Sequence, residues 1–125
     1  MYDIVILDSG LSVNSSEQIS GLCIKVTDGN EITIDSENYA DLNGHGTIIY
    51  NTIRKYSPES CVLMVKIFDD KHDIDEDNLF VVLNYIKDNI PCRIINLSCG
   101  LKICHKISIF KKLCADIVAS GTIIV

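Results

Sequence analysis

Several features that would set this chain apart from ordinary globular proteins are scarce or missing. Its 125 residues include only two prolines, and they contain no internal repeat or low-complexity tract. Hydrophobic residues make up 47% of the chain and charged residues 22%, a balance that disordered segments do not have. A chain of this length can bury one core, so we expect residues 1–125 to form a single domain.

An excess of positive charge is also absent. Eleven Lys and Arg side chains stand against seventeen Asp and Glu, the net charge is −6, and the basic residues are dispersed. Nucleic-acid binding needs a basic stripe or patch, so we expect no nucleic-acid partner.

Targeting and membrane signals are missing as well. Residues 1–8 have no basic start and soon reach a carboxylate, unlike a signal peptide. No uncharged apolar run approaches the length that spans a bilayer. The sequence therefore predicts a cytoplasmic protein without a membrane partner.

The six cysteines lack the paired Cys-x-x-Cys spacing of many metal and redox sites. They are Cys23, Cys61, Cys92, Cys99, Cys104 and Cys114. Several lie in apolar runs, which predicts reduced, buried thiols rather than disulfides. Cys99, Cys104 and His105 are the set that could ligate a metal, but their spacing is not typical, so we expect neither a metal nor another cofactor.

Short apolar runs alternate with stretches of helical periodicity along the chain. The expected strands are 2–7, 61–67, 93–97 and 122–125, and an expected hairpin pairs 22–26 with 31–34 as an excursion from the core. The expected helices are 45–56, a segment around 79–86 that ends before Pro91, and 107–118, which ends at Gly121. This alternation predicts an α/β domain of three layers, with a mostly parallel sheet and helices on both faces.

The apolar residues of each helical segment give its expected face. They are Ile48, Ile49, Ile53 and Tyr56 in the first helix, Leu79, Val82, Leu83 and Ile86 in the second, and Ile107, Phe110, Cys114, Ile117 and Val118 in the third.

Unusual polar residues are expected at one edge of this sheet. Asp8 ends the first strand, His45 begins the first helix, and Ser98, Cys99 and Gly100 follow the strand 93–97. Ligands of parallel sheets gather where the strands end, so these residues form the candidate site.

An aspartate and a histidine in this arrangement suit proton transfer. A buried carboxylate can hold the imidazole in one tautomer and stabilise the imidazolium that forms during reaction. Taken alone, an aspartate in the place of Asp8 more often caps a helix, accepts a phosphoryl group or binds magnesium, and the default role of His45 alone is capping or core packing.

The order of the motifs Asp8-Ser9-Gly10, Gly44-His45-Gly46-Thr47 and 94–100 (Ile-Ile-Asn-Leu-Ser-Cys-Gly) resembles the N-terminal portion of the subtilisin-like serine peptidases, or subtilases. The resemblance implies that Asp8 is the orienting acid and His45 the general base. It also implies that Ser98, Cys99 and Gly100 line an edge that pairs with an extended peptide or protein substrate.

The resemblance stops short of the serine motif. The chain ends at Val125 within an expected strand, before the family's oxyanion asparagine and Gly-Thr-Ser turn, so we expect it to be inactive alone. Neither Ser9, Ser98 nor Cys99 has the setting of a nucleophile. We therefore expect a Ser-bearing C-terminal segment or complementary chain, or self-association through an exposed strand edge.

Three further alternatives concern metal and function. The run Asp73, Asp75, Asp77 starts like a calcium loop, but Asn78 and Asn84 occupy positions where an EF-hand has glycine and glutamate. Calcium elsewhere is possible only by family resemblance. The functional alternatives are a noncatalytic peptide-binding or inhibitory remnant of a subtilase, and a receiver-like domain with Asp8 as phosphoacceptor.

Overall fold

Six strands and three helices form in the part of the chain that this computed structural model describes, which is residues 1–12, 19–71, 73–99, 101 and 104–125. The elements are β1 (Tyr2–Asp8), β2 (Ser20–Thr27), β3 (Glu31–Asp35), α1 (His45–Tyr56), β4 (Val62–Lys66), α2 (Glu76–Asn89), β5 (Cys92–Leu97), α3 (Ile107–Ala119) and β6 (Ile123–Ile124). The predicted order of strands and helices is confirmed.

The strands make one sheet in the order β3-β2-β4-β1-β5-β6. All neighbouring pairs are parallel except β2 with β3, which confirms the mostly parallel sheet. β1 lies between β4 and β5, so its backbone is hydrogen-bonded on both sides. A strand in this position is buried on both faces, which explains its continuous apolar sequence.

The hairpin is the first correction to the sequence prediction. β2 and β3 do pair as an antiparallel hairpin, but the hairpin is not an excursion, because β2 also pairs with β4 as part of the main sheet. The physical reason is that β2 carries buried Cys23 and Ile24, which the core requires.

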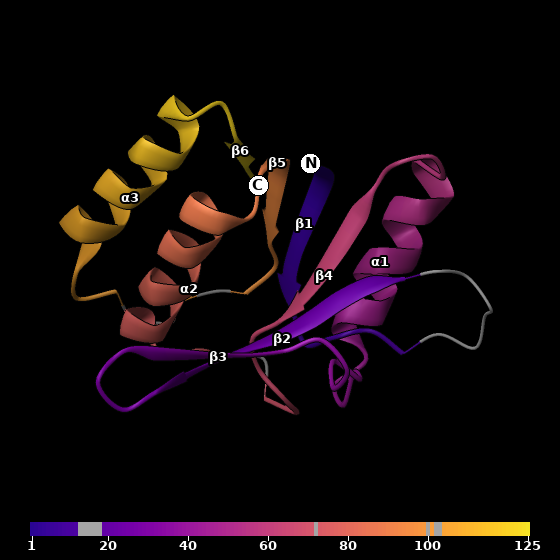
Figure 1. The fold of residues 1–125 in the computed structure, drawn as a ribbon, viewed down its shortest axis with the longest axis horizontal. Helices are drawn as coiled ribbons and strands as arrows, with labels where there is room; N and C mark the ends of the chain where they lie inside the picture. The colour runs from indigo at the N-terminus through magenta and orange to yellow at the C-terminus, as the bar shows by residue number, and fades with distance from the viewer. Residues whose placement is uncertain (13–18, 72, 100, 102–103) are drawn as a thin grey trace.

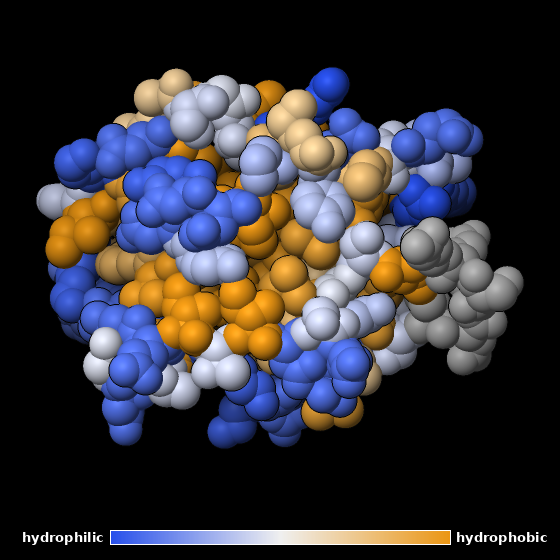
Figure 2. Space-filling model, in the orientation of Figure 1, coloured by the Kyte–Doolittle hydropathy of each residue, from blue (hydrophilic) through white to orange (hydrophobic). Residues whose placement is uncertain are grey.

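Helices cover both faces of the sheet, with α1 on one side and α2 and α3 on the other (Figure 1). Side chains of β1 divide between them: Val5 and Leu7 pack with α2 and α3, whereas Ile6 packs with Tyr50 of α1. Figure 2 shows apolar side chains gathered in the middle of one face, over the region between α2 and β2. The three-layer α/β prediction is therefore confirmed.

The predicted helix face is confirmed in full for α2 and in part for α1, where Ile49 and Ile53 pack on the core. All four predicted residues of α2, from Leu79 to Ile86, are buried. In α1, Ile48 and Tyr56 are exposed and Tyr50 is buried instead, because the helix turns Gly46 toward the sheet and Tyr50 lies one turn further along that face.

α3 differs in the same way. Ile107 and Val118 are exposed, while Leu113 and Ile117 are buried. Phe110 completes this face by stacking on Phe80 of α2, with ring centroids 5.6 Å apart. α3 therefore packs through a stripe spaced by three and four residues. Cys114 is half-buried beside this stripe, and Ile109 is exposed like Ile107 and Val118.

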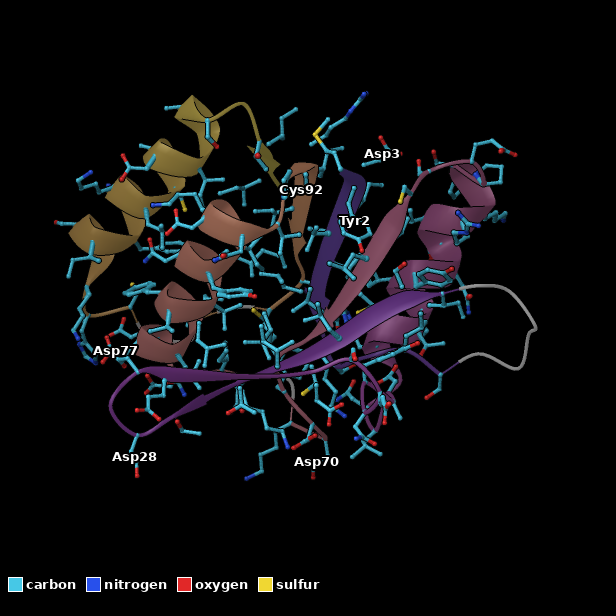
Figure 3. All side chains as sticks on the ribbon, in the orientation of Figure 1. Tyr2, Asp3, Asp28, Asp70, Asp77 and Cys92 are labelled. Atoms are coloured by element: carbon cyan, nitrogen blue, oxygen red, sulfur yellow. The ribbon has the colours of Figure 1, made fainter. Side chains whose placement is uncertain are left out.

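Different residues lie at the edge of the sheet where the parallel strands begin and at the edge where they end. Tyr2 and Cys92 are register partners at the starts of β1 and β5 and lie at one edge, whereas Asp28 and Asp70 follow β2 and β4 at the opposite edge (Figure 3). That second edge, where the strands end, also holds Asp8.

The helices and the cysteines also bear on membrane insertion and redox state. None of the helices in the described ranges has the length and apolar character needed to cross a bilayer. All six cysteines are free thiols, as predicted, although Cys61 is exposed and Cys104 and Cys114 are only half-buried.

The fully buried α2 face predicts a large stability difference between two leucines. Leu83→Ala removes a side chain with 0% exposure and should lower the free energy of unfolding by about 2–5 kcal/mol. Leu42→Ala, at a leucine with 67% exposure, should change it by less than about 0.5 kcal/mol. Urea denaturation of both variants checks this, and equal losses would contradict the assignment of the core.

Candidate active site

The site lies at the carboxyl end of β1, between two strands whose preceding helices lie on opposite faces of the sheet. β4 and β5 flank β1, and the helices that precede them, α1 and α2, cover opposite faces of the sheet. Such a switch point opens a crevice beyond the carboxyl ends of the strands. Asp8 is the last residue of β1 and is fully buried there.

The structure brings Asp8 and His45 into contact. The Nδ1 atom of His45 lies 2.9 Å from Oδ2 and 3.1 Å from Oδ1 of Asp8. A carboxylate only accepts hydrogen bonds, so Nδ1 carries the hydrogen and Nε2 is the basic nitrogen of the neutral ring. The Asp8 side chain is 0% exposed and the His45 side chain 38%, so a buried charge holds a ring that solvent reaches.

Two glycines next to His45 make this contact possible. Gly44 has φ +96°, a conformation that L side chains rarely adopt. Gly46 lies against the Ser9–Gly10 turn so closely that a Cβ atom there would be 2.3 Å from the carbonyl oxygen of Gly10. The first turn of α1 therefore reaches the end of β1 only because residue 46 has no side chain.

Asp41 is the main site residue that the sequence prediction missed. Its Oδ1 atom accepts the Ser9 hydroxyl at 2.7 Å and the backbone N–H groups of Asn43 and Gly44 at 3.0 and 2.8 Å. Its Oδ2 atom accepts the backbone N–H and the hydroxyl of Thr47 at 2.9 and 2.6 Å. Asp41 lies three residues before Gly44, the N-cap of α1, so the usual N-cap signal of the sequence does not identify it.

These hydrogen bonds change the acidity of Asp41. Partial burial alone would raise the pKa of this carboxyl, but the hydrogen bonds from Thr47, Gly44 and Ser9 outweigh burial and lower the pKa to about 2. Asp41 is therefore ionised throughout the neutral range.

The loop that carries Asp41 is fastened to the next strand. Lys66, the last residue of β4, is buried and donates from Nζ to the carbonyl oxygen of Ala40 at 2.5 Å. Its charge is balanced by Asp69 at 3.2 Å. Asn43 donates from Nδ2 to the carbonyl oxygen of Asp70 at 2.7 Å. The loop thus sits between β1, α1 and β4.

Two of the three residues predicted to line a substrate edge are described. Ser98 and Cys99 follow β5 directly, one position beyond the register pair Leu7 and Leu97, which puts them beside the strand end that carries Asp8. Gly100 lies outside the described residues. The Ser98 hydroxyl donates to the side-chain oxygen of Asn96.

Cys99 is a buried thiol near the Asp8–His45 pair. Burial, reinforced by the negative charge of Asp8, raises its pKa to about 11. The thiolate is the reactive form of cysteine, so Cys99 stays protonated and unreactive at neutral pH.

The acidic segment before α2 caps that helix. Asp75 accepts the backbone N–H of Asp77 at 2.9 Å, and Glu76 and Asp77 lie in the first turn, where negative charge is stabilising. Within the described ranges, no three His, Cys, Asp or Glu side chains are grouped so that they could hold a metal ion.

The sequence was compared with protein families and with curated proteins. No protein-family model matches this chain, and no curated protein has a matching sequence. The function must therefore be argued from the site itself.

The close approach at Gly46 predicts unequal effects of two alanines. Gly46→Ala places a methyl group against the backbone of Gly10, so it should displace α1 and lower the free energy of unfolding by about 3 kcal/mol. Gly44→Ala meets no atom and should cost only the backbone strain, about 1 kcal/mol. Thermal and urea unfolding compare them, and a Gly46→Ala variant as stable as the wild type would contradict the packing.

The acidity of Asp41 predicts a pH-dependent stability. Its folded-state pKa, about 2, lies below the unfolded value of 3.8, so its contribution is complete above about pH 4 and is lost as the pH falls towards 2. Asp41→Asn should cost on the order of 1–2 kcal/mol near pH 6, and the gap from wild type should narrow between pH 4 and pH 2. Urea unfolding across this range measures the gap, and a gap that stays constant would refute the assignment.

Proposed function

We propose that residues 1–125 carry the acid–base pair of a subtilisin-like serine peptidase. In this proposal Asp8 is the orienting acid, His45 is the general base, and the reaction is the hydrolysis of a peptide bond. The observation that supports it is the contact of 2.9 Å between the Nδ1 atom of His45 and the fully buried carboxylate of Asp8.

The chemistry follows from that contact. Asp8 accepts the Nδ1 hydrogen, so the lone pair of the neutral ring is on Nε2, where it can take a proton from a hydroxyl. The imidazolium that forms is stabilised by the carboxylate 2.9 Å away, and this attraction is strong because water does not reach Asp8. His45 then gives the proton to the leaving amine.

The nucleophile comes from outside the described residues. The Ser9 hydroxyl donates to Asp41 and accepts from the Gly46 N–H, and the Ser98 hydroxyl donates to Asn96, so both are committed to structural contacts. Cys99 is buried and protonated. We therefore assign the serine to a Ser-bearing segment or a complementary chain, which also supplies the oxyanion hole.

The substrate is a peptide or protein in an extended conformation. Ser98 and Cys99 continue β5 beyond its last ladder residue, beside Asp8. A peptide that adds to this edge presents its main chain to backbone groups and alternate side chains to pockets. Free thiols throughout the six cysteines suit a cytoplasmic location.

The alternatives make different demands on Asp8 and His45. A phosphoacceptor aspartate must be reached by its phosphoryl donor, whereas Asp8 is fully buried against His45, so the acid–base role is favoured. A noncatalytic peptide-binding remnant would use the same substrate edge without turnover.

The test supplies the serine hydroxyl that the proposed reaction requires. The chain is combined, in trans or by fusion after Val125, with the Ser-bearing segment of a subtilisin-like peptidase, and hydrolysis of a chromogenic peptide is followed. We expect hydrolysis that falls about 10⁴-fold in His45→Ala and in Asp8→Asn. His105→Ala, at an exposed histidine on the loop before α3, is the matched control and should retain activity.

Assembly is monitored by co-elution in size-exclusion chromatography. A co-eluting complex that binds the peptide without cleaving it would support the noncatalytic remnant. Hydrolysis that survives His45→Ala would overturn the role of the pair, and labelling of Asp8 by acetyl phosphate would favour the phosphoacceptor.

A further inference from the structure

We infer that Asp41 is a positioning residue for the Asp8–His45 pair: its carboxylate ties the turn after β1 to the first turn of α1 and thereby sets the distance between the acid and the imidazole. No hydrogen bond joins Asp41 to either member of the pair among the described contacts, so it acts through other groups. The geometric part of this inference stands alone, whereas any effect on peptide hydrolysis rests on the proposed function.

The contacts of Asp41 surround His45 in the sequence. Its two carboxylate oxygens accept the N–H of Gly44, immediately before His45, and the N–H and hydroxyl of Thr47, two residues after it. The His45 N–H itself donates to the side-chain oxygen of Asn43 at 3.2 Å. The backbone around His45 is therefore held by the ionised carboxylate of Asp41 and by the side-chain amide of Asn43.

Ser9 joins this carboxylate to the acid of the pair. The Ser9 hydroxyl has one hydrogen, which it donates to Asp41, and its oxygen accepts the N–H of Gly46 at 3.0 Å. The Ser9 N–H donates to Oδ1 of Asp8 at 2.7 Å. Without the carboxylate of Asp41 the hydroxyl hydrogen loses its acceptor, and the Ser9 oxygen is no longer held in one position for the Gly46 N–H.

The two ends of this link differ in rigidity. Asp8 is fixed by β1, which pairs with β4 and β5 on both sides. In α1, Gly46 and Tyr50 are buried and Ile49 and Ile53 pack beside Tyr50, so the later turns anchor the helix, while the first turn is placed by the hydrogen bonds to Asp41. Loss of Asp41 should therefore leave the sheet intact and move His45 relative to Asp8.

Asp75 provides a matched comparison. It also lies just before a helix and accepts a backbone N–H in the first turn, in its case that of Asp77. That contact stays within α2 and reaches neither β1 nor α1. Asp75→Asn therefore changes the charge as Asp41→Asn does, without touching the link.

The experiment measures the tautomer of His45 in the full chain. The protein is labelled with ¹⁵N-histidine, and the shifts of both ring nitrogens are read through the carbon-bound ring protons at about pH 9, where imidazoles are neutral. His45→Gln assigns the signals. Contact of Nδ1 with the Asp8 carboxylate favours the Nδ1–H tautomer, so the ratio of Nδ1–H to Nε2–H reports the pair.

We expect Asp41→Asn to lower this ratio about tenfold or more, because its amide keeps one acceptor oxygen where the carboxylate accepts through both, and the hydrogen bonds to a charged group are lost. Asp75→Asn should keep the wild-type ratio. A purely structural role would lower stability and leave the tautomer of the folded protein unchanged. A folded Asp41→Asn protein with the wild-type ratio would therefore overturn the inference.

A second pair of variants covers the case in which Asp41→Asn does not fold. Thr47→Val removes one donor to Asp41, and Thr47→Ser keeps it. The ratio should fall severalfold in Thr47→Val and recover in Thr47→Ser, and an unchanged ratio in Thr47→Val would again overturn the inference. The tautomer is read without a nucleophile, so this result and the hydrolysis test can fail independently.

Discussion

The close contact between the first turn of α1 and the turn after β1 is the constraint on which the site depends. Gly46 lies where any Cβ atom would overlap the carbonyl oxygen of Gly10, so the backbone of the helix start packs directly on the backbone after β1. This approach brings the His45 ring within 2.9 Å of Asp8. The helix face that packs on the sheet, with Tyr50 one turn after Gly46, follows from the same contact.

Burial of a carboxylate is unfavourable unless donors surround it, and the chain meets this requirement locally. Asp8 accepts from its neighbour's N–H and from the His45 ring, while Asp41 accepts five hydrogen bonds from the turn and the helix start. Lys66 is buried at the adjacent strand end and balanced by Asp69. Charges at this edge are thus held by short-range contacts, which gives a rigid setting for the Asp8–His45 contact.

The sequence predicted what depends on local pattern and failed where tertiary contacts decide. The buried face of α2, from Leu79 to Ile86, is predicted correctly because every apolar residue of that stripe is buried. Ile48 was assigned to a helix face that α1 exposes, because the contact at Gly46, invisible to periodicity, rotates the helix. Asp8 and His45 were found through their motifs. Asp41 was missed because its importance arises from partners on β1 and α1 that only folding brings together.

The central place of β1 has a consequence for how the pair comes into being. Its register partners are distant in the chain: Ile4 aligns with Val62 on one side and with Ile94 on the other. Such long-range pairing must wait for chain closure and makes folding slow. During synthesis β4 is made well before β5, so the sheet on both sides of β1 can be completed only after residue 97 has left the ribosome. Full enclosure of the Asp8–His45 contact by the sheet is thus a late event in the life of the nascent polypeptide.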